Sequence, residues 1–466
     1  LLDEEVNGGR PNWETIAQLQ KSLGKRGDGE SRRALLTRFI ASHPPEEGVD
    51  AYFVMASMLK DEGKQLEAEE LYQQVVVRYP ERPEALEAQW LQAWGRIRRG
   101  DHAAALDALQ ALVKKVPARS EEQSRAQYWL ARLLVLTGAR KEGEGLFLEV
   151  QRQFPNSYYG AMAGWRLASG YPPVMVGGAP GALEARVRVS GEEPAELGLR
   201  LLFPGFAEHL ARVSHPGPAS HLEKAKELWL MDLSSEAFTE IAAATTHPQA
   251  DSQARWMGAA LCHAMGSMGG GIKNGHRYMA GTSPEEEVVP ERRALAFPMP
   301  YQDAILRHAS NRGIEPALVA ALIQQESTFR ADIGSPVGAR GLMQIMPYTG
   351  RDIAGWLGIK HYQSRYLNNP DFNLRLGTEY MRAMLAKFDG SLVKTLASYN
   401  AGPQAVTKWV RRFGDLEDDY LAEEIPYKET RHYVRVVLRN FKGYLNTYGI
   451  PLVQGPVQSH EQTATR

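Results

Sequence analysis

The stretch Pro316-Ala-Leu-Val-Ala-Ala-Leu-Ile-Gln-Gln-Glu326-Ser-Thr-Phe329 predicts an apolar helix that ends in a carboxylate. Proline suits the first helical position, and Leu318, Leu322 and Glu326 follow at four-residue spacing on one face. The negative end of the helix dipole and apolar surroundings both disfavour the ionised form of Glu326. A carboxyl that stays protonated near neutral pH is what a general acid requires. The alternative is a glutamate that turns to solvent at a frayed helix end.

A second cluster follows at once, in Ser335-Pro-Val-Gly-Ala-Arg-Gly-Leu-Met-Gln-Ile-Met-Pro347. Its glycines allow the backbone to pass close to a ligand. Met343 and Met346 are suited to line an adaptable groove, and Gln344 offers a polar fixing point. The alternative is a tight hairpin that serves only the core.

Two further clusters lie near the end of the chain. In Ala397-Ser-Tyr-Asn-Ala-Gly402 a helix is expected to end, so that Tyr399 presents its hydroxyl to a cleft, although Asn400 and Gly402 also suit a simple helix cap. In Ile425-Pro-Tyr-Lys-Glu-Thr-Arg-His-Tyr433, Glu429 opens a helix, where a carboxylate is favoured in any case. Taken singly, each cluster also has a purely structural explanation.

Residues 296–450 are predicted to form one mostly helical domain with at most one short hairpin, at 334–344. Prolines between 281 and 300 mark its boundary, with 281–295 as a linker, and the polar residues 451–466 are expected to be disordered. The expected helices are Tyr301–Arg312, Pro316–Ser327, Leu374–Phe388, Leu392–Asn400, Gln404–Phe413 and Glu429–Tyr448.

The N-terminal part, 1–280, contains a repeat. Glycines at 63, 100 and 138 and prolines at 80, 117 and 155 recur with the same spacings. One helix is expected to end at each glycine, and a second helix to end at each proline, which gives a series of helical hairpins. These hairpins are similar to tetratricopeptide repeats, and they bury their apolar faces only by stacking into a curved superhelix. The repeats cover about 51–160, a linker 170–194 and further hairpins 197–268, and Gly269-Gly-Gly271 is expected to break the pattern as a loop.

The composition of the 466-residue chain excludes several classes of protein. The apolar and charged contents, 43% and 23%, are those of a water-soluble protein, and the net charge of −1 gives no global field for nucleic acid. A single cysteine, Cys262, excludes an internal disulfide. No apolar run approaches the roughly 20 residues that span a bilayer. The twelve histidines lack metal-ligand spacing, so neither metal nor cofactor is expected. The start at Leu1, without an initiating methionine or a signal sequence, suggests a processed or trimmed chain, from which export cannot be read directly.

Together and in this order, the four clusters closely resemble the catalytic domain of the soluble lytic transglycosylases, whose lysozyme-like fold is related to goose-type lysozyme. The resemblance covers about 296–450, and Tyr128-Trp-Leu-Ala-Arg132 and Ser157-Tyr-Tyr-Gly160 extend it loosely to the family's superhelical scaffold. It implies a mostly α protein in which an α-superhelical scaffold precedes a lysozyme-like α(+β) catalytic domain.

The resemblance also implies a role for each motif position. Glu326 matches the single catalytic acid and base of the family. The matching substrate-binding positions are Ser335, Met343, Gln344, Met346, Tyr399, Asn400, Glu429 and Tyr433. One departure is Ser398, where the family often has alanine. The family cleaves the bond between N-acetylmuramic acid and N-acetylglucosamine without water and leaves a 1,6-anhydro end.

The resemblance leaves two other functions open. The same domain could hydrolyse the bond, as goose-type lysozymes do, or the repeats could bind partners and carry an inert lysozyme-like module. A peptidoglycan substrate implies the periplasm, and hence a signal peptide that has been removed from this chain. Other cell-wall enzymes are candidate partners. The sequence does not decide between cleavage at chain ends and internal cleavage, nor the peptide-stem preference, the oligomeric state or closure of the scaffold into a ring.

Overall fold

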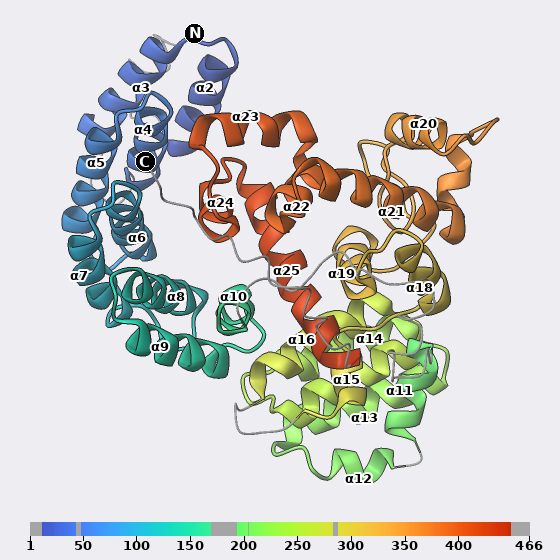
Figure 1. Cartoon of the computed structure of the whole chain (residues 1–466). Helices are drawn as coiled ribbons and strands as arrows, with labels where there is room; N and C mark the ends of the chain where they lie inside the picture. Colours follow the sequence, from blue (N-terminus) through green and yellow to red (C-terminus); the bar gives the residue numbers. More distant parts are fainter. Residues whose placement is uncertain (1–11, 43–47, 169–192, 204, 283–287, 449–466) are drawn as a thin grey trace. The chain divides into compact units, whose positions relative to one another are not determined.

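The computed structural model describes residues 12–42, 48–168, 193–203, 205–282 and 288–448. The predicted linker at 170–194 lies almost wholly outside these residues, and the predicted tail at 451–466 lies entirely outside them. The chain divides into two compact units, Leu1–Phe154 and Pro155–Arg466 (Figure 1). The described structure is mostly helical, as the sequence predicts.

The first unit is a row of antiparallel helices in which consecutive helices pack together (Figure 1). Gly63, Gly100 and Gly138 follow helix ends with φ values of 79°, 77° and 97°, a conformation that glycine adopts at little cost. The predicted repeat is therefore confirmed. The helices of this unit are α2 (Trp13–Lys25), α3 (Gly29–Ser42), α4 (Val49–Asp61), α5 (Gln65–Arg78), α6 (Pro83–Arg98), α7 (His102–Val113), α8 (Glu121–Leu136) and α9 (Arg140–Gln153).

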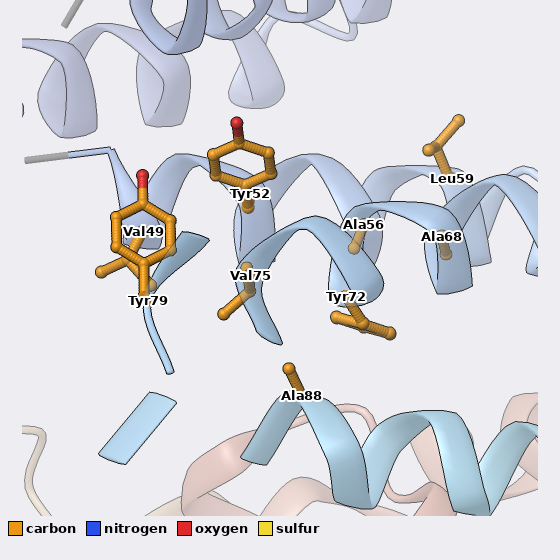
Figure 2. Close-up of a cluster of buried hydrophobic side chains, with 9 residues drawn as sticks. All are labelled: Val49, Tyr52, Ala56, Leu59, Ala68, Tyr72, Val75, Tyr79 and Ala88. Carbon is orange, nitrogen blue, oxygen red and sulfur yellow. The ribbon is translucent and has the colours of Figure 1, made fainter. Parts of the chain in front are cut away.

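Each hairpin of this unit completes its core with the next helix. Figure 2 shows one such core, in which Tyr52 from α4 and Tyr72 and Val75 from α5 are buried together, and Ala88 from α6 belongs to the same cluster. Fully burying one large apolar side chain stabilises a fold by about 1.5–3 kcal/mol. Since α6 contributes to the core of the preceding pair, a hairpin removed from its neighbours would expose part of this cluster.

The second unit begins with α10 and continues through a group of helical hairpins. Its first helices are α10 (Tyr158–Leu167), α11 (Pro194–Leu202), α12 (Phe206–Leu210), α13 (Pro216–Leu230), α14 (Ser234–Thr246), α15 (Ser252–Ala264) and α16 (Met268–Gly281). α10 packs against the last helix of the chain, where Trp165 lies 6.1 Å from Phe441 between ring centroids. The Tyr159 hydroxyl also donates to Glu423 Oε1 at 2.6 Å.

The prediction of a loop at Gly269-Gly-Gly271 is wrong, because these residues form the first turn of α16. A Cβ on Gly271 would overlap the ring of His263, and one on Gly270 would lie 3.0 Å from the sulfur of Cys262. The glycines therefore allow α16 to approach α15 closely. Glycine weakens a helix by up to about 1 kcal/mol relative to alanine, and packing between the two helices outweighs that preference here.

The remaining helices, together with the loop at 334–347, carry the four motifs. They are α17 (Pro290–Ala294), α18 (Gln302–Ser310), α19 (Pro316–Ser327), α20 (Pro347–Trp356), the 3-10 helix η3 (Ser364–Asn368), α21 (Pro370–Lys387), α22 (Leu392–Ala401), α23 (Pro403–Phe413), α24 (Asp418–Glu424) and α25 (Lys428–Tyr448). The prediction omits α17, α20, η3 and α24. Instead of a regular hairpin, 334–345 contains two isolated antiparallel bridges, which join Arg340 to Gly334 and to Ile345.

Helix α19 lies at the centre of this part and packs against α25 (Figure 1). Every residue from Pro316 to Gln324 is buried, so α19 is apolar on all sides rather than amphipathic. Within the described ranges, no helix is long and apolar enough to cross a membrane.

Candidate active site

Glu326 lies in the last turn of α19, and the chain turns sharply just after it. Thr328 and Phe329 have left-handed φ values of 50° and 61°, which end the helix. The Ser327 hydroxyl donates to the Leu342 carbonyl oxygen at 2.8 Å and thereby ties the helix end to the 334–347 loop. The carboxyl group is thus held where a helix end, a loop and α25 converge.

The Glu326 side chain is half-buried and accepts one strong hydrogen bond, from the Tyr433 hydroxyl to Oε1 at 2.6 Å. Burial raises the pKa of Glu326 from 4.5 to about 7, because an ionised carboxylate loses hydration there. The Tyr433 hydroxyl acts in the opposite direction, since it stabilises the carboxylate. A group with a pKa near 7 can both donate and accept a proton at neutral pH.

Tyr433 is fixed on the buried face of α25, with 5% of its side chain exposed. Burial, followed by the nearby charge of Glu326, raises the pKa of Tyr433 well above its usual value. The phenol is therefore protonated throughout the range in which Glu326 titrates, so it acts as a hydrogen-bond donor.

The 334–347 loop is organised by a buried amide that sequence reasoning missed. The Asn373 side chain accepts from the Met343 N–H at 2.8 Å and donates to the carbonyls of Arg340 at 2.9 Å and Leu367 at 2.8 Å. Gly341 has a φ of 76°, and a Cβ there would overlap the Leu367 carbonyl. Asn373 precedes the predicted helix at 374–388, so helical periodicity gave no signal for its role.

Two predicted binding residues shape this loop through their own hydrogen bonds. The Ser335 hydroxyl accepts from the Ala339 N–H at 2.9 Å. The Gln344 amide donates to the Gly341 carbonyl at 2.8 Å and the Ile333 carbonyl at 3.2 Å, and Gln344 itself has a φ of 46°. Both side chains therefore stabilise the turn as the structure stands.

Tyr399, in the last turns of α22, lies close to Glu326. Its hydroxyl donates to the Met343 carbonyl at 2.9 Å, and its ring meets that of Tyr380 edge-on at 5.4 Å between centroids. Burial raises the pKa of Tyr399, and the Glu326 charge is the next cause, which places the two groups in electrostatic range. The sequence does not single out Tyr380, because an aromatic residue within a predicted helix is usually assigned to the hydrophobic core.

The sequence predicts that the Met343 side chain lines a groove, and the structure places it elsewhere. The side chain is fully buried, and a Cβ on Gly377 would overlap its sulfur. Only the backbone carbonyl of Met343 faces the site, as the acceptor for Tyr399. The thioether belongs to the core that supports the loop.

The remaining predicted residues lie on neighbouring elements. Asn400 is exposed near the end of α22, and its side-chain oxygen accepts from the Thr430 hydroxyl at 2.6 Å. This bond joins α22 to the first turn of α25, where Glu429 is exposed. Met346 is half-buried and precedes α20. The structure thus brings Tyr433 and Tyr399 to Glu326, with the Met343 carbonyl bound to Tyr399, and it joins Asn400 to the first turn of α25, where Glu429 lies.

In the part of the chain that the structure describes, no three His, Cys, Asp or Glu side chains gather as metal ligands would.

Comparison with protein families decides what this arrangement resembles. Residues 303–422 match the transglycosylase SLT domain. Residues 53–120 and 90–158 match the tetratricopeptide repeat. Both resemblances predicted from the motifs are confirmed, and all the residues grouped around Glu326 except Tyr433 and Glu429 fall inside the matched SLT segment.

Curated relatives agree with the family match. The soluble lytic murein transglycosylase of Escherichia coli K12 is 37% identical over 144 residues, which are 30% of this chain and 22% of that protein. A putative soluble lytic murein transglycosylase of Haemophilus influenzae is 32% identical over 146 residues, 31% of this chain and 25% of that protein. The matches therefore span a quarter or less of the relatives' own length.

Solved structures extend the likeness along most of the chain. An inactive mutant of lytic transglycosylase Slt from Pseudomonas aeruginosa superposes with a TM-score of 0.64 and 24% identity, covering 94% of this chain and 67% of that one. The 70 kDa soluble lytic transglycosylase from Escherichia coli gives a TM-score of 0.51 and 20% identity over 94% and 68% of the two chains. At these identities the likeness establishes the fold.

Proposed function

We propose that this protein is a peptidoglycan lytic transglycosylase that cleaves the β-1,4 bond between N-acetylmuramic acid and N-acetylglucosamine, with Glu326 as acid and then base. One observation carries the proposal. The Glu326 carboxyl, at the end of a buried helix, has a pKa near 7 and accepts a hydrogen bond from the Tyr433 hydroxyl. Among the described residues, burial and the Tyr433 hydroxyl cause its pKa shift, and no second carboxylate contributes. A retaining glycosidase would place a second carboxyl about 5–5.5 Å away.

In the first step, protonated Glu326 donates its proton to the oxygen that leaves as the glycosidic bond breaks. Positive charge then develops at the anomeric carbon of the muramic acid residue. The 2-acetamido group of the same sugar stabilises that charge, so the protein need not supply a nucleophile. The Tyr433 hydroxyl stabilises the carboxylate that Glu326 becomes, because it already donates to Oε1.

In the second step, the carboxylate of Glu326 removes the proton from the 6-hydroxyl of the same sugar. The oxygen of that hydroxyl bonds to the anomeric carbon and closes the 1,6-anhydro ring. Glu326 is protonated again by the 6-hydroxyl proton, in place of the proton that it gave to the leaving oxygen, so no water is consumed. An attack within one molecule has an effective concentration far above that of a bimolecular attack, up to about 10⁵–10⁸ M in well-oriented cases.

The surrounding residues receive supporting roles in this proposal. Tyr399 and Ser335 orient the acetamido group, and Tyr399 is favoured for this by its position beside Glu326. Gln344, Met346, Asn400, Glu429 and Tyr433 line the glycan groove. The contribution of Met343 is reduced to its carbonyl, which fixes the Tyr399 hydroxyl.

We assign catalysis to residues 296–450, with 281–295 as a linker and 1–280 as a scaffold. The substrate implies action in the periplasm. The scaffold is proposed to shape access to the glycan and to contact other cell-wall enzymes. Since α10–α16 belong to the same compact unit as the catalytic residues, the informative deletion removes only residues 1–154. If envelope proteins retained by the full chain were retained equally by the shortened one, a partner-binding role for those repeats would be contradicted.

The test is digestion of purified peptidoglycan sacculi, with mass spectrometry of the released muropeptides. We expect the wild-type protein to release products with 1,6-anhydro ends. Glu326→Gln should abolish release while the protein still folds and binds sacculi. Glu291→Gln, which alters an exposed glutamate on α17, is the matched control and should release products at the wild-type rate. Substantial activity in Glu326→Gln would refute the assignment.

A further inference from the structure

A buried polar network occupies the side of α19 that faces away from Glu326. Its centre is Gln324, whose side chain is 4% exposed. The Gln324 amide nitrogen lies 3.0 Å from His276 Nε2 on α16 and donates to the Ala296 carbonyl at 3.3 Å. The Tyr444 hydroxyl on α25 lies 2.6 Å from Gln324 Oε1. A buried amide with this many partners is held firmly, since leaving any of its groups unpaired costs about 1–3 kcal/mol.

The helix geometry relates this network to Glu326. Gln324 and Glu326 are two residues apart, so their side chains leave α19 in directions about 200° apart. Their partners Tyr444 and Tyr433 lie on α25 eleven residues apart, which is about three turns and about 16 Å. The two hydrogen bonds therefore anchor opposite sides of the last turn of α19 to two separate points on one helix. Together they fix the rotation of α19 about its own axis.

The network also has a rigid third side. A Cβ on Gly275 of α16 would lie 2.6 Å from the Ala296 backbone nitrogen, and one on Gly443 of α25 would overlap the Phe297 ring. The His276 ring meets the Phe297 ring edge-on, at 5.0 Å between centroids. The segment 295–298 is thus held tightly between α16 and α25. The Ala296 carbonyl accepts from the Gln324 amide, and the Pro298 carbonyl lies 2.7 Å from the Tyr444 hydroxyl, where it shares the single hydroxyl proton with Gln324 Oε1.

His276 and Gln324 keep the same protonation state across the pH range in which Glu326 titrates. The Gln324 amide nitrogen can only donate, so His276 Nε2 must accept, which requires a neutral ring. Burial, and secondly the charge of Arg439, lower the pKa of His276 to about 3. Titration of Glu326 near pH 7 therefore leaves the partners of Gln324 unchanged.

We propose that Gln324, held by Tyr444 and His276, is a positioning residue that sets the rotation of α19 and so aligns the Glu326 carboxyl with the Tyr433 hydroxyl. The geometric part of this inference stands by itself, and its catalytic consequence rests on the proposed function. This positioning role has no local sequence signal, because His276 and Tyr444 are distant along the chain from Gln324.

The geometric part is tested with crystal structures of the full chain carrying Gln324→Met or Tyr444→Phe. Tyr448→Phe is the matched control, since it keeps the ring that stacks on Tyr444 and removes a buried hydroxyl that donates to the Phe297 carbonyl at 2.9 Å and not to Gln324. We expect the distance between Glu326 Oε1 and the Tyr433 hydroxyl to exceed 3.5 Å, beyond hydrogen-bonding range, in the first two variants and to stay near 2.6 Å in the control. An unchanged distance in Gln324→Met would overturn the proposal whatever the protein's activity.

The catalytic consequence is tested by a double-mutant cycle on sacculus turnover. Tyr444→Phe should lower kcat about tenfold with little change in KM, as expected when alignment for the chemical step is lost. Combined with Tyr433→Phe it should cost no more than Tyr433→Phe alone, because both act on one hydrogen bond. Tyr448→Phe should leave kcat unchanged. Full additivity of Tyr444→Phe and Tyr433→Phe would mean that Tyr444 is merely structural. A wild-type protein without turnover would instead refute the proposed function, and the crystallographic distances would still decide the positioning role.

Discussion

Replacing Glu326 with glutamine should stabilise the protein above neutral pH, although the same change removes the proposed catalytic group. Glutamine keeps the size of the side chain and an oxygen that accepts from Tyr433. It removes only the ionisation, which burial makes unfavourable. Glu326 therefore offers a way to measure the electrostatic cost of the site separately from catalysis.

The magnitude follows from the pKa of Glu326, which burial raises from 4.5 to about 7 in the folded protein. Below about pH 4.5 the carboxyl is protonated in both the folded and the unfolded states, and burial of the neutral form carries no ionisation cost. Between 4.5 and 7 only the unfolded state releases the proton, so the free energy of unfolding falls as pH rises. Since one pKa unit corresponds to about 1.4 kcal/mol, the loss is on the order of 3 kcal/mol above pH 7.

Hydrogen exchange of the α19 amides, followed by mass spectrometry, measures this cost without requiring the whole chain to unfold in one step. Glu326→Gln and the wild-type protein should exchange alike at about pH 4.5. At pH 8 the variant should exchange on the order of 100-fold more slowly, because its helix opens less often. Glu429→Gln, an exposed change at the start of α25, should not alter α19 exchange at either pH. Equal protection of Glu326→Gln and wild type at pH 8 would refute the claim that burial disfavours the Glu326 carboxylate.

Three further predictions concern the groups around Glu326. Tyr433→Phe should raise the pKa of Glu326 above 7, because the Tyr433 hydroxyl lowers that pKa. The fall of kcat/KM at alkaline pH should therefore move to higher pH, and a shift to lower pH would contradict the prediction. Tyr399→Phe leaves the Met343 carbonyl without its donor and should reduce kcat by about tenfold or more with a small change in melting temperature, whereas wild-type kcat would show that the bond is dispensable. Gly341→Ala should destabilise the protein by about 2 kcal/mol or more in thermal unfolding, because its φ is 76° and a Cβ would meet the Leu367 carbonyl. Gly355→Ala, in an open position on α20, should stabilise it by up to about 1 kcal/mol, and equal melting temperatures for both variants would contradict the argument.

The helical hairpins and α19 could be predicted because their signals are local. Helices end at Gly63, Gly100 and Gly138 because glycine readily adopts a positive φ. Helix α19 begins at Pro316 because the ring of proline fixes a φ that suits the first helical position. The expectation that the Glu326 carboxyl resists ionisation also follows from neighbours on the same helix, and the structure gives it a pKa near 7.

Features that depend on packing between distant segments were missed or wrong. The glycines at 269–271 belong to a helix because α15 and α16 pack closely, which a local rule for glycine does not foresee. Met343 is sequence-adjacent to Gln344, yet its side chain is buried against Gly377. Asn373 fixes the loop from 30 residues away. The period of a helix indicates that such residues are buried, and it does not indicate which loop or helix they support.

The most direct test of the central claim is digestion of sacculi by the wild-type protein in water enriched in ¹⁸O. If the Glu326 carboxylate takes its proton from the 6-hydroxyl of the same sugar, and that oxygen closes the ring, the new muropeptide ends are 1,6-anhydro and contain no ¹⁸O. Reducing ends that are one water heavier and carry ¹⁸O would show that water attacks the anomeric carbon, and would contradict the account.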